Sequence, residues 1–395
     1  MNTLSNSAIE APHNTVDLLD RLIAFPSVSR TPNRDLIDYV RVVLEQAGIA
    51  SELVTGGNDA NANLFATIGP TDIPGVILSG HTDVVPTAGQ NWTVNPFKLT
   101  KRGGRLYGRG TTDMKGFIAC AIRAATLAKK RPLKRPLHLA FSYDEEIGCV
   151  GVRHLLDWLQ TSPHRAAFCL IGEPTSLSVA TGHKGKMALR ATFHGREIHS
   201  ALAPGGLNAI HLASEFIQAL RKEQQHLAEH GSRDGDYDIP YSTVHAGIIT
   251  GGTALNIVPN EAAVDFEIRH LKADDPQAIL STIKASAEEI ASRYRDDFPE
   301  ASVEIETVNA YPGLDTAPNA EIVSFIKSLT GANATIKVAF GTEGGLFSEK
   351  LEVPTVVCGP GSMQQGHKPD EFITEEQLDL CDRMLETLID RLCAD

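Results

Sequence analysis

Short apolar runs alternate with helix-like periodicity in the first part of the chain. The runs at 76–78, 137–143 and 166–171 are rich in apolar residues, which is typical of strands in the interior of a sheet. Between them, 117–129 and 152–159 carry apolar residues three and four positions apart, a spacing that predicts helices. Strands that alternate with helices in this way indicate an α/β protein built on a layered sheet.

After residue 183 the pattern changes to strand, helix, strand, strand, helix, strand. The expected strands are 187–193, 243–249, 262–269 and 302–308, and the expected helices are 208–224 and 276–295. This order matches the split βαβ, or ferredoxin-like, α+β sandwich, which is a compact unit in its own right. The layered pattern then resumes, with a helix near 321–329 and a strand at 354–358. We therefore predict a layered-sheet domain of residues 1–183 and 313–395, interrupted by an inserted βαββαβ domain of residues 184–312.

Composition narrows the class of protein. A chain of 395 residues with 42% hydrophobic and 22% charged residues is long and apolar enough for two folded domains. The net charge of -13 argues against a nucleic-acid partner, and no apolar segment approaches the roughly 18 residues that span a bilayer. The first residues lack the pattern of a signal peptide, and the six cysteines include no C-x-x-C pair. We expect a cytoplasmic protein with reduced thiols and no membrane partner.

Side chains that can bind metal follow the predicted strands, where ligand sites of α/β sheets form. The candidates are His81, Glu145, Glu146 and Glu173 at three strand ends, Asp113 in a glycine-rich turn before a helix, and His367 in a loop after the last strand. Alone, a histidine at a strand end is usually structural, and an aspartate before a helix is usually a cap. Together on one rim, two imidazoles and at least three carboxylates suit zinc.

The number of these residues predicts two metal ions, because a single catalytic zinc uses three protein ligands. A two-metal site needs one bridging carboxylate, and Asp113 is the natural candidate because it is short and held by a tight turn. Neighbouring side chains of extended backbone point in opposite directions, so one of Glu145 and Glu146 can bind metal while the other accepts a proton. The alternative is a solvated acidic loop. Asp83, two residues after His81, can accept the second ring N–H of that histidine and fix its tautomer.

Several stretches together resemble the M20 metallopeptidase family. They lie in the order of that family over nearly the whole chain, at 79–86, 108–116, 144–148, 172–175, 195–200 and 358–370. The resemblance implies a zinc-dependent exopeptidase-like domain that carries two Zn²⁺ ions, with Co²⁺ or Mn²⁺ as substitutes. In the family pattern, His81 and Glu173 bind one metal and Glu146 and His367 bind the other. Asp113 bridges the two, and Glu145 is the general base.

For the inserted domain, the resemblance implies a lid that also forms a homodimer. His199 falls in the family position that stabilises the tetrahedral oxyanion, often across the dimer. Asn256 and Arg269 match lid positions that bind the carboxylate of the substrate. The family also implies a cis peptide bond after the bridging residue, between Asp113 and Met114.

Within this family, the stretches 172–176, 341–347 and 367–371 look most like members that hydrolyse N2-acetyl-L-ornithine to L-ornithine and acetate in arginine biosynthesis. We therefore expect a small N-acyl amino acid as substrate, with Glu343 near the ammonium of the ornithine side chain. The alternatives are a succinyl-diaminopimelate desuccinylase, a hydrolase of dipeptides or other N-acyl amino acids, and a non-catalytic amino-acid-binding homologue. A nucleotide-binding protein is disfavoured, because the glycines at 108 and 110 do not form G-x-G-x-x-G after a strand.

Overall fold

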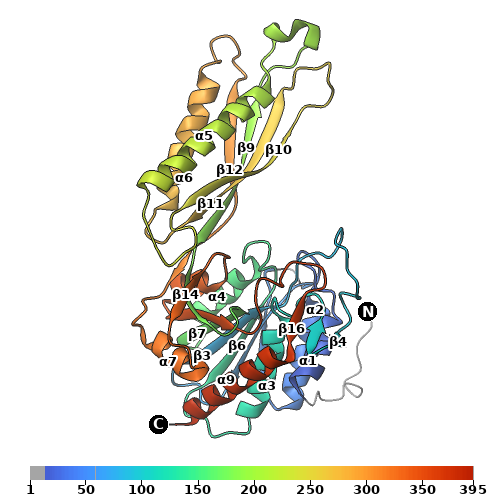
Figure 1. Cartoon of the computed structure of the whole chain (residues 1–395), viewed down its shortest axis with the longest axis vertical. Coiled ribbons are helices and arrows are strands. Elements are labelled where there is room, and N and C mark those ends of the chain that lie inside the picture. The colour runs from blue at the N-terminus through green and yellow to red at the C-terminus, as the bar shows by residue number, and fades with distance from the viewer. Residues whose placement is uncertain (1–13, 58, 395) are drawn as a thin grey trace. The chain divides into compact units, whose positions relative to one another are not determined.

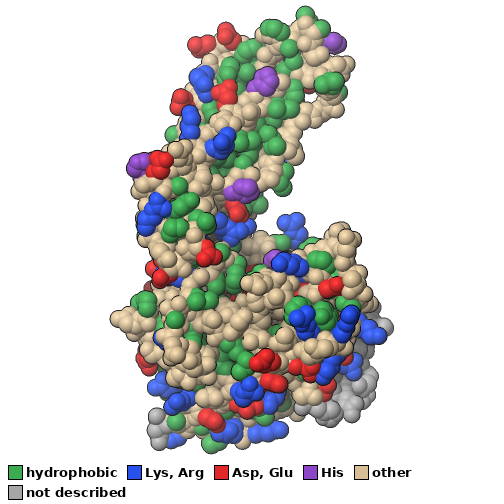
Figure 2. Space-filling model, viewed as in Figure 1, with side chains coloured by type: hydrophobic (Ala, Val, Ile, Leu, Met, Phe, Trp, Pro, Cys, Tyr) green, Lys and Arg blue, Asp and Glu red, His purple; other side chains and the backbone are tan. Residues whose placement is uncertain are grey.

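The structure of the protein is a computed structural model that describes residues 14–57 and 59–394 (Figure 1). The chain forms two compact units. The first contains the described residues up to Gly182, Leu314–Lys337 and the described residues from Thr342 onward, and the second contains His183–Gly313 and Val338–Gly341. Acidic and basic side chains are interspersed on the visible face of the first unit (Figure 2). No helix among the described residues is long and apolar enough to cross a membrane.

A nine-stranded sheet forms the centre of the first unit. Its strands are β1 Ser51–Val54, β2 Asn63–Ile68, β3 Gly75–His81, β6 Leu137–Ser142, β7 Ala166–Pro174, β8 Val179–His183, β13 Leu314–Asp315, β14 Thr335–Val338 and β15 Thr355–Gly359. They lie in the order β1-β2-β6-β3-β7-β15-β8-β13, and β14 pairs with β8. The three central pairs, β6 with β3, β3 with β7 and β7 with β15, are parallel. Every residue of β3 and β6 is buried, as expected for parallel strands covered on both faces.

Helices cover this sheet, and α3 lies at its centre. The helices are α1 Thr15–Ile23, α2 Arg34–Gln46, α3 Lys115–Ala128, α4 Gly151–Thr161, α7 Glu321–Thr330, α8 Gly344–Leu351 and α9 Glu375–Cys393. Helix α3 packs against β3 and β6 of the sheet and against the helices α1 and α9. That position explains why the helix is apolar almost all round, with fully buried side chains such as Phe117 and Ile118.

The parallel strands bring the ends of distant segments to one edge of the sheet. His81 ends β3 and pairs with Ser142, which ends β6. Strand β7, parallel to β3 on its other side, ends at Pro174, directly after Glu173. The predicted candidates from these three strands therefore share the carboxyl edge of the sheet.

A small sheet in the order β16-β5-β4 anchors two loops beside this edge. Its strands are β4 Thr100–Arg102, β5 Arg105–Tyr107 and β16 Phe372–Thr374. Phe372 pairs with Tyr107, so the loop that ends at Glu371 lies beside the turn that begins at Gly108. The Gly108 N–H donates to the Glu371 carbonyl at 2.9 Å. The glycine-rich turn and the histidine loop are thereby joined through their backbones.

The second unit is a four-stranded antiparallel sheet with two helices along it (Figure 1). Its elements are β9 Gly185–His194, the short 3₁₀ helix η1 Ser200–Gly205, α5 Ala209–His230, β10 Thr243–Gly251, β11 Glu261–His270, α6 Pro276–Ser292 and β12 Ser302–Tyr311. The sheet order is β10-β11-β9-β12, and burial alternates residue by residue along β9. This arrangement confirms the predicted α/β fold with a βαββαβ unit. Helix α5 extends beyond the predicted 208–224, because Leu220 and Leu227 are both buried and continue its apolar stripe.

The two ends of the βαββαβ segment lie side by side. A Cβ on Gly185, at the start of β9, would lie 2.7 Å from the backbone nitrogen of Gly313. A Cβ on Gly313 would lie 2.8 Å from the Gly185 nitrogen and from the His183 carbonyl oxygen. Only residues without a side chain allow the backbones to approach this closely.

Candidate metal centre

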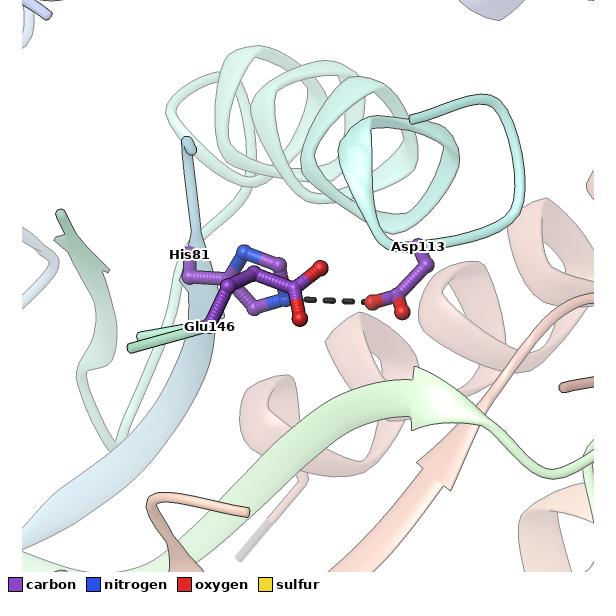
Figure 3. Close-up of side chains that lie close together, drawn as sticks. All are labelled: His81, Asp113 and Glu146. Atoms are coloured by element: carbon purple, nitrogen blue, oxygen red, sulfur yellow. Dashed lines mark hydrogen bonds and ion pairs between the residues drawn. The ribbon is translucent and has the colours of Figure 1, made fainter. Parts of the chain in front are cut away.

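Asp113 lies between two imidazoles and faces each with a different oxygen. Its Oδ1 is 3.1 Å from Nε2 of His81, and its Oδ2 is 3.1 Å from Nε2 of His367. Asp113 stands in the turn directly before α3, and the peptide bond to Met114 is cis, as the family resemblance implies. Figure 3 shows the side chains of His81, Asp113 and Glu146 converging from β3, this turn and the loop after β6.

Each imidazole also has a carboxylate that the other imidazole lacks. His81 Nε2 lies 3.5 Å from Oε1 of Glu173, and His367 Nε2 lies 3.1 Å from both oxygens of Glu146. The structure therefore contains two groups that share Asp113. We call His81 and Glu173 the strand-held pair, because β3 and β7 carry them, and Glu146 and His367 the loop-held pair.

The two pairs differ in exposure. The side chains of His81 and Glu173 are 1% and 5% exposed. The side chain of His367 is 45% exposed, and its residue has a φ of +60°. Such left-handed backbone is uncommon outside glycine, and it turns the imidazole toward Asp113 and Glu146.

Glu145 lies beside the strand-held pair. One of its carboxylate oxygens and the ligand atoms of His81 and Glu173 all lie within 4.8 Å of one another. The same limit holds for ligand atoms of His81, Asp113 and Glu146. The neighbouring residues Glu145 and Glu146 thus reach different groups, although the backbone here runs through a turn after the positive φ of Asp144 and not through the extended conformation that we expected.

Asp83 holds the backbone of Glu145 and Glu146 in place. Its carboxylate accepts hydrogen bonds from the backbone N–H groups of Glu145 at 3.0 Å and Glu146 at 3.3 Å, and from the Ser29 hydroxyl at 2.8 Å. The nearest acceptor to Nδ1 of His81 is the backbone carbonyl of Asp83 at 2.9 Å, whereas the Asp83 carboxylate is 3.5 Å away. This carboxylate therefore orients the backbone of the two glutamates, and both the backbone carbonyl and the carboxylate of Asp83 lie beside the imidazole of His81.

The pKa values of the glutamates show that several buried acidic groups lie close together in this site. Burial, and next the charge of Asp113, raise the pKa of Glu146 to about 7 and that of Glu173 to about 8. Burial also raises the pKa of Glu145 well above its usual range. Hydrogen bonds to Asp113 and Glu146 raise the pKa of His367 to about 10. Burial opposes ionisation of Asp113, but hydrogen bonds from His367 and His81 outweigh it and keep the pKa of Asp113 low.

These properties fit a site for divalent cations. Buried carboxylates that repel one another gain most from a cation, and the donor set of imidazole nitrogens and carboxylate oxygens is one that zinc accepts. Asp113, which has one oxygen toward each imidazole, has the arrangement that a bridging ligand requires.

Glu343, which we predicted near the substrate ammonium, lies at the start of α8 with an exposure of 1%. Its carboxylate accepts hydrogen bonds from the hydroxyl groups of Ser142 and, at 3.3 Å, Ser79. These serines lie on β6 and β3 near their carboxyl ends. Burial raises the pKa of Glu343 to about 7.

The three predicted residues of the second unit do not lie together. His199 and Asn256 are neighbours, since the Ser200 N–H donates to the Asn256 carbonyl at 2.9 Å. Both are close to the end of β11 that begins at Glu261, whereas Arg269 lies near the opposite end of that strand. The eight residue steps from Glu261 to Arg269 span roughly 26 Å of extended chain. Arg269 donates to the carboxylate of Glu267 at 3.0 Å.

Residues that carry no predicted role complete the surroundings of Asp113. Arg109 and Glu371 form a buried ion pair at 2.6 Å, and Gln90 links Arg109 to the backbone of His367. Arg109 and Glu371 both stand in stretches that carry the family resemblance, at 108–116 and beside 358–370. Their pairing has no local signal in the sequence, because they are far apart along the chain.

The fold and the site define a class of protein. Imidazoles and carboxylates around a shared aspartate, at the carboxyl edge of an α/β sheet with a further carboxylate beside them, are typical of a metal-dependent hydrolase. The chain belongs to the peptidase family M20/M25/M40, whose model matches residues 77–391. It is accordingly a metal-dependent hydrolase that acts on amide bonds.

Known proteins resemble the chain over nearly its whole length. It is 34% identical over 383 residues to an acetylornithine deacetylase of Myxococcus xanthus, a match that covers 95% of this chain and 96% of that protein. A metallo-carboxypeptidase of the M20 family from Sulfolobus solfataricus has a similar fold, with a TM-score of 0.79, 20% identity and coverage of 96% and 99% of the two chains. A dinuclear metal-binding M20 peptidase from Bacillus subtilis superposes with a TM-score of 0.67 and 18% identity, over 96% of this chain and 97% of that one.

Proposed function

We propose that the protein is a two-zinc amidohydrolase that converts N2-acetyl-L-ornithine to L-ornithine and acetate. The observation that carries the two-metal proposal is the placement of Asp113 between two imidazoles, each with its own carboxylate. His81 and Glu173 would hold one ion, and Glu146 and His367 would hold the other. Asp113 would bind both ions. The name of the relative from Myxococcus xanthus supports the substrate, and the dinuclear peptidase of Bacillus subtilis supports two metals.

Glu145 is the proposed general base. When bound, two zinc ions supply Lewis acidity for the amide carbonyl and lower the pKa of a water molecule toward about 7. Glu145 removes a proton from the attacking water and delivers it to the nitrogen of the leaving amine as the C–N bond breaks. Asp83 holds the backbone of Glu145 and Glu146 through their N–H groups, so that the two carboxylates keep their separate places.

We further propose that the protein acts as a homodimer through the inserted unit, with His199 and Asn256 of one copy serving the substrate of another. Within the second unit, Arg269 lies at the far end of β11 from these residues, so the three cannot surround one small substrate within one copy of that unit. Arg269 is the proposed partner of the substrate carboxylate, and His199 that of the developing oxyanion. Hydrophobic side chains are visible on the surface of the second unit (Figure 2), and Ile248 and Val308 are exposed on its sheet.

Glu343 remains the proposed determinant for the ammonium of ornithine. Its buried carboxylate accepts hydrogen bonds from two serines near the carboxyl ends of β3 and β6, which supports a role directed toward the rim of the sheet. Glu343→Gln should reduce kcat/KM for N2-acetyl-L-ornithine and leave that for N-acetyl-L-norvaline, which has no side-chain ammonium, nearly unchanged. An unchanged ratio between the two substrates would remove Glu343 from this role.

The test of the proposed function is amine release from three substrates by the zinc-loaded and the metal-stripped enzyme. N2-acetyl-L-ornithine, N-succinyl-diaminopimelate and a dipeptide distinguish the branches of the family. We expect zinc-dependent turnover with preference for N2-acetyl-L-ornithine. A preference for another of the three would overturn the proposed substrate and keep the site, whereas turnover that zinc does not affect would overturn the metal role.

With this substrate, the product L-ornithine supports a place in arginine biosynthesis. The six cysteines are all free, and five of them are buried, which supports work in the reducing environment of the cytoplasm.

A further inference from the structure

The loop-held pair lacks the support that the strand-held pair receives from the sheet. His81 and Glu173 stand on β3 and β7, which are paired in parallel and buried. His367 stands in the loop between β15 and β16, is half-exposed and has a left-handed backbone conformation. A ligand in such a loop needs other contacts, which keep the imidazole of His367 facing Asp113 and Glu146.

The backbone of this loop is held by side chains from two other loops. Nε2 of Gln90 donates to the His367 carbonyl at 2.9 Å. Nη1 of Arg109 reaches the Lys368 carbonyl at 3.4 Å, and Nη2 of Arg109 donates to Oε1 of Gln90 at 2.5 Å. The same oxygen of Gln90 accepts from the indole N–H of Trp92 at 3.0 Å, and the guanidinium lies 5.0 Å from the centre of that ring.

Glu371 connects this loop to the bridging carboxylate. Its Oε1 accepts hydrogen bonds from the backbone N–H groups of Thr112 at 2.9 Å and Asp113 at 3.2 Å. Its Oε2 accepts from Nη1 of Arg109 at 2.6 Å. The side chains of Arg109 and Glu371 are 0% and 1% exposed. One hydrogen-bonded network thus holds the backbones of Asp113 and His367, which are far apart in the sequence.

We propose that Gln90, Arg109 and Glu371 are positioning residues that set the distance between Asp113 and His367, and through it the zinc affinity of the loop-held position. This inference rests on the proposed two-metal function. Burying an ion pair costs desolvation free energy, so the Arg109–Glu371 pair adds little to stability beyond what apolar side chains would. Its distinguishing property is geometric, because a guanidinium can bind Glu371, Gln90 and the Lys368 carbonyl at once and an ammonium cannot.

Two substitutions test the network without leaving a buried charge unpaired. Gln90→Glu keeps an acceptor for Arg109 and Trp92 but removes the N–H that holds the His367 carbonyl. The added negative charge would by itself favour a cation, so weaker binding reports lost positioning. Arg109→Lys keeps the positive charge beside Glu371 but loses the two-nitrogen guanidinium group that also binds Gln90 and the Lys368 carbonyl. Gln160→Glu is the matched control, because the Gln160 amide also donates to a backbone carbonyl, that of Lys350, at 2.7 Å in a different part of the unit.

The experiment is calorimetric titration of the metal-stripped full-length chain with Zn²⁺. Wild type and Gln160→Glu should show two binding steps. Both network variants should bind the second ion roughly 10–100-fold more weakly, the range seen when residues that support metal ligands are replaced, and the first ion with nearly unchanged affinity. Excess Zn²⁺ should restore their kcat, whereas a general loss of folding would not be reversed by metal. Melting curves of the stripped proteins provide the check on folding.

Different results separate this inference from the proposed function. Two zinc steps of unchanged affinity in both network variants would overturn the positioning role and leave the two-metal site intact. A wild-type chain that binds fewer than two zinc ions would overturn both. Equal weakening of the two steps would also overturn the inference, because the network would then support Asp113 alone.

Discussion

The strand-held and loop-held pairs place the same residue types, one histidine and one glutamate, around a single aspartate by different physical means. For His81 and Glu173, parallel strands fix the backbone, and burial restricts the side chains. For Glu146 and His367, the backbone runs through turns, with positive φ at Asp144 and at His367 itself. Their positions depend on polar contacts from Asp83 and Gln90.

The difference shows that a ligand can be held by a ladder of backbone hydrogen bonds or by a few side-chain contacts. A ladder is cooperative and insensitive to single substitutions on the surface. A set of side-chain contacts can be removed one at a time, so the affinity of the loop-held position is the property that mutation can adjust most readily. Asp113 belongs to both arrangements, so its replacement should weaken metal binding at both positions together.

The largest effect is expected for Asp113→Ala, because both positions lose their shared ligand. Zinc content should fall for both ions, and turnover should drop to that of the metal-stripped enzyme. Metal analysis after gel filtration and an amine-release assay provide the measurement. Asp35→Ala, an exposed aspartate on α2, serves as the control. Full activity in Asp113→Ala would rule out a bridging role.

Glu145→Ala should separate chemistry from metal binding. Glu145 lies beside the strand-held pair but is not a proposed ligand, so both zinc ions should be retained. Without a base, kcat should fall about 10²–10⁴-fold while KM changes little. Steady-state kinetics together with zinc analysis check this expectation. Retained turnover would exclude Glu145 as the base, and lost zinc would show that it is a ligand.

Replacing His81 or His367 by alanine in the metal-stripped protein should lower the free energy of unfolding by different amounts, because the two side chains differ in burial. His81→Ala removes the imidazole beside the buried carboxylate of Glu173 and leaves Asp113 with that of His367 alone, which should lower the free energy of unfolding by about 3 kcal/mol. His367→Ala removes a half-exposed imidazole and should cost less than about 1 kcal/mol. Urea unfolding of both variants measures the contrast. Equal losses would mean that the two pairs are equally buried in solution.

The last prediction concerns His138, on β6 at the end of the sheet away from the candidate ligands, where the effect appears only as the pH falls. Burial lowers the pKa of His138 to about 4, whereas the pKa values of His81 and His367 are raised. Because the folded pKa lies below the unfolded value of about 6.5, stability is full above the unfolded pKa and is lost as pH falls toward 4. From about pH 7 to about pH 5 this group should remove about 2 kcal/mol.

His138→Gln should reduce that pH dependence in the metal-stripped protein, since the replacement does not titrate. Urea unfolding of wild type and variant at the two pH values gives the difference. If both proteins lose the same stability between these pH values, His138 does not carry the predicted proton linkage. The comparison uses stripped protein so that release of metal at low pH does not contribute.

Much of the fold and of the candidate ligand set could be predicted because the signals are local. Apolar runs mark β3, β6 and β7, and the carboxyl ends of parallel strands meet at one edge. His81, Glu146 and Glu173 could therefore be placed together from their positions after these runs. The βαββαβ order of the second unit could be predicted for the same reason, since each element is long and periodic.

The support around the ligands could not be predicted, because it joins residues that are distant in sequence and lie in short or irregular segments. The strands β5 and β16 have three residues each and show no usable alternation. Their pairing brings Glu371 to the amide of Asp113, and a separate loop contact brings Gln90 to His367. Likewise, the sequence spacing suggested that the carboxylate of Asp83 serves His81, and this carboxylate does lie 3.5 Å from Nδ1 of His81, but its bonds to the backbone N–H groups of Glu145 and Glu146 had no signal in the sequence.

The place of β15 in the sheet has a consequence for biosynthesis. The chain leaves the ribosome from its N-terminus, and all strands and helices of the second unit have been made when Tyr311 emerges. The first unit must wait longer, because β15 fills the gap between β7 and β8, and α9, which follows, covers α3. A nascent chain therefore carries a completed insert within an unfinished sheet, with the edges of β7 and β8 open until β15 has been translated. In this interval chaperones have the most to protect.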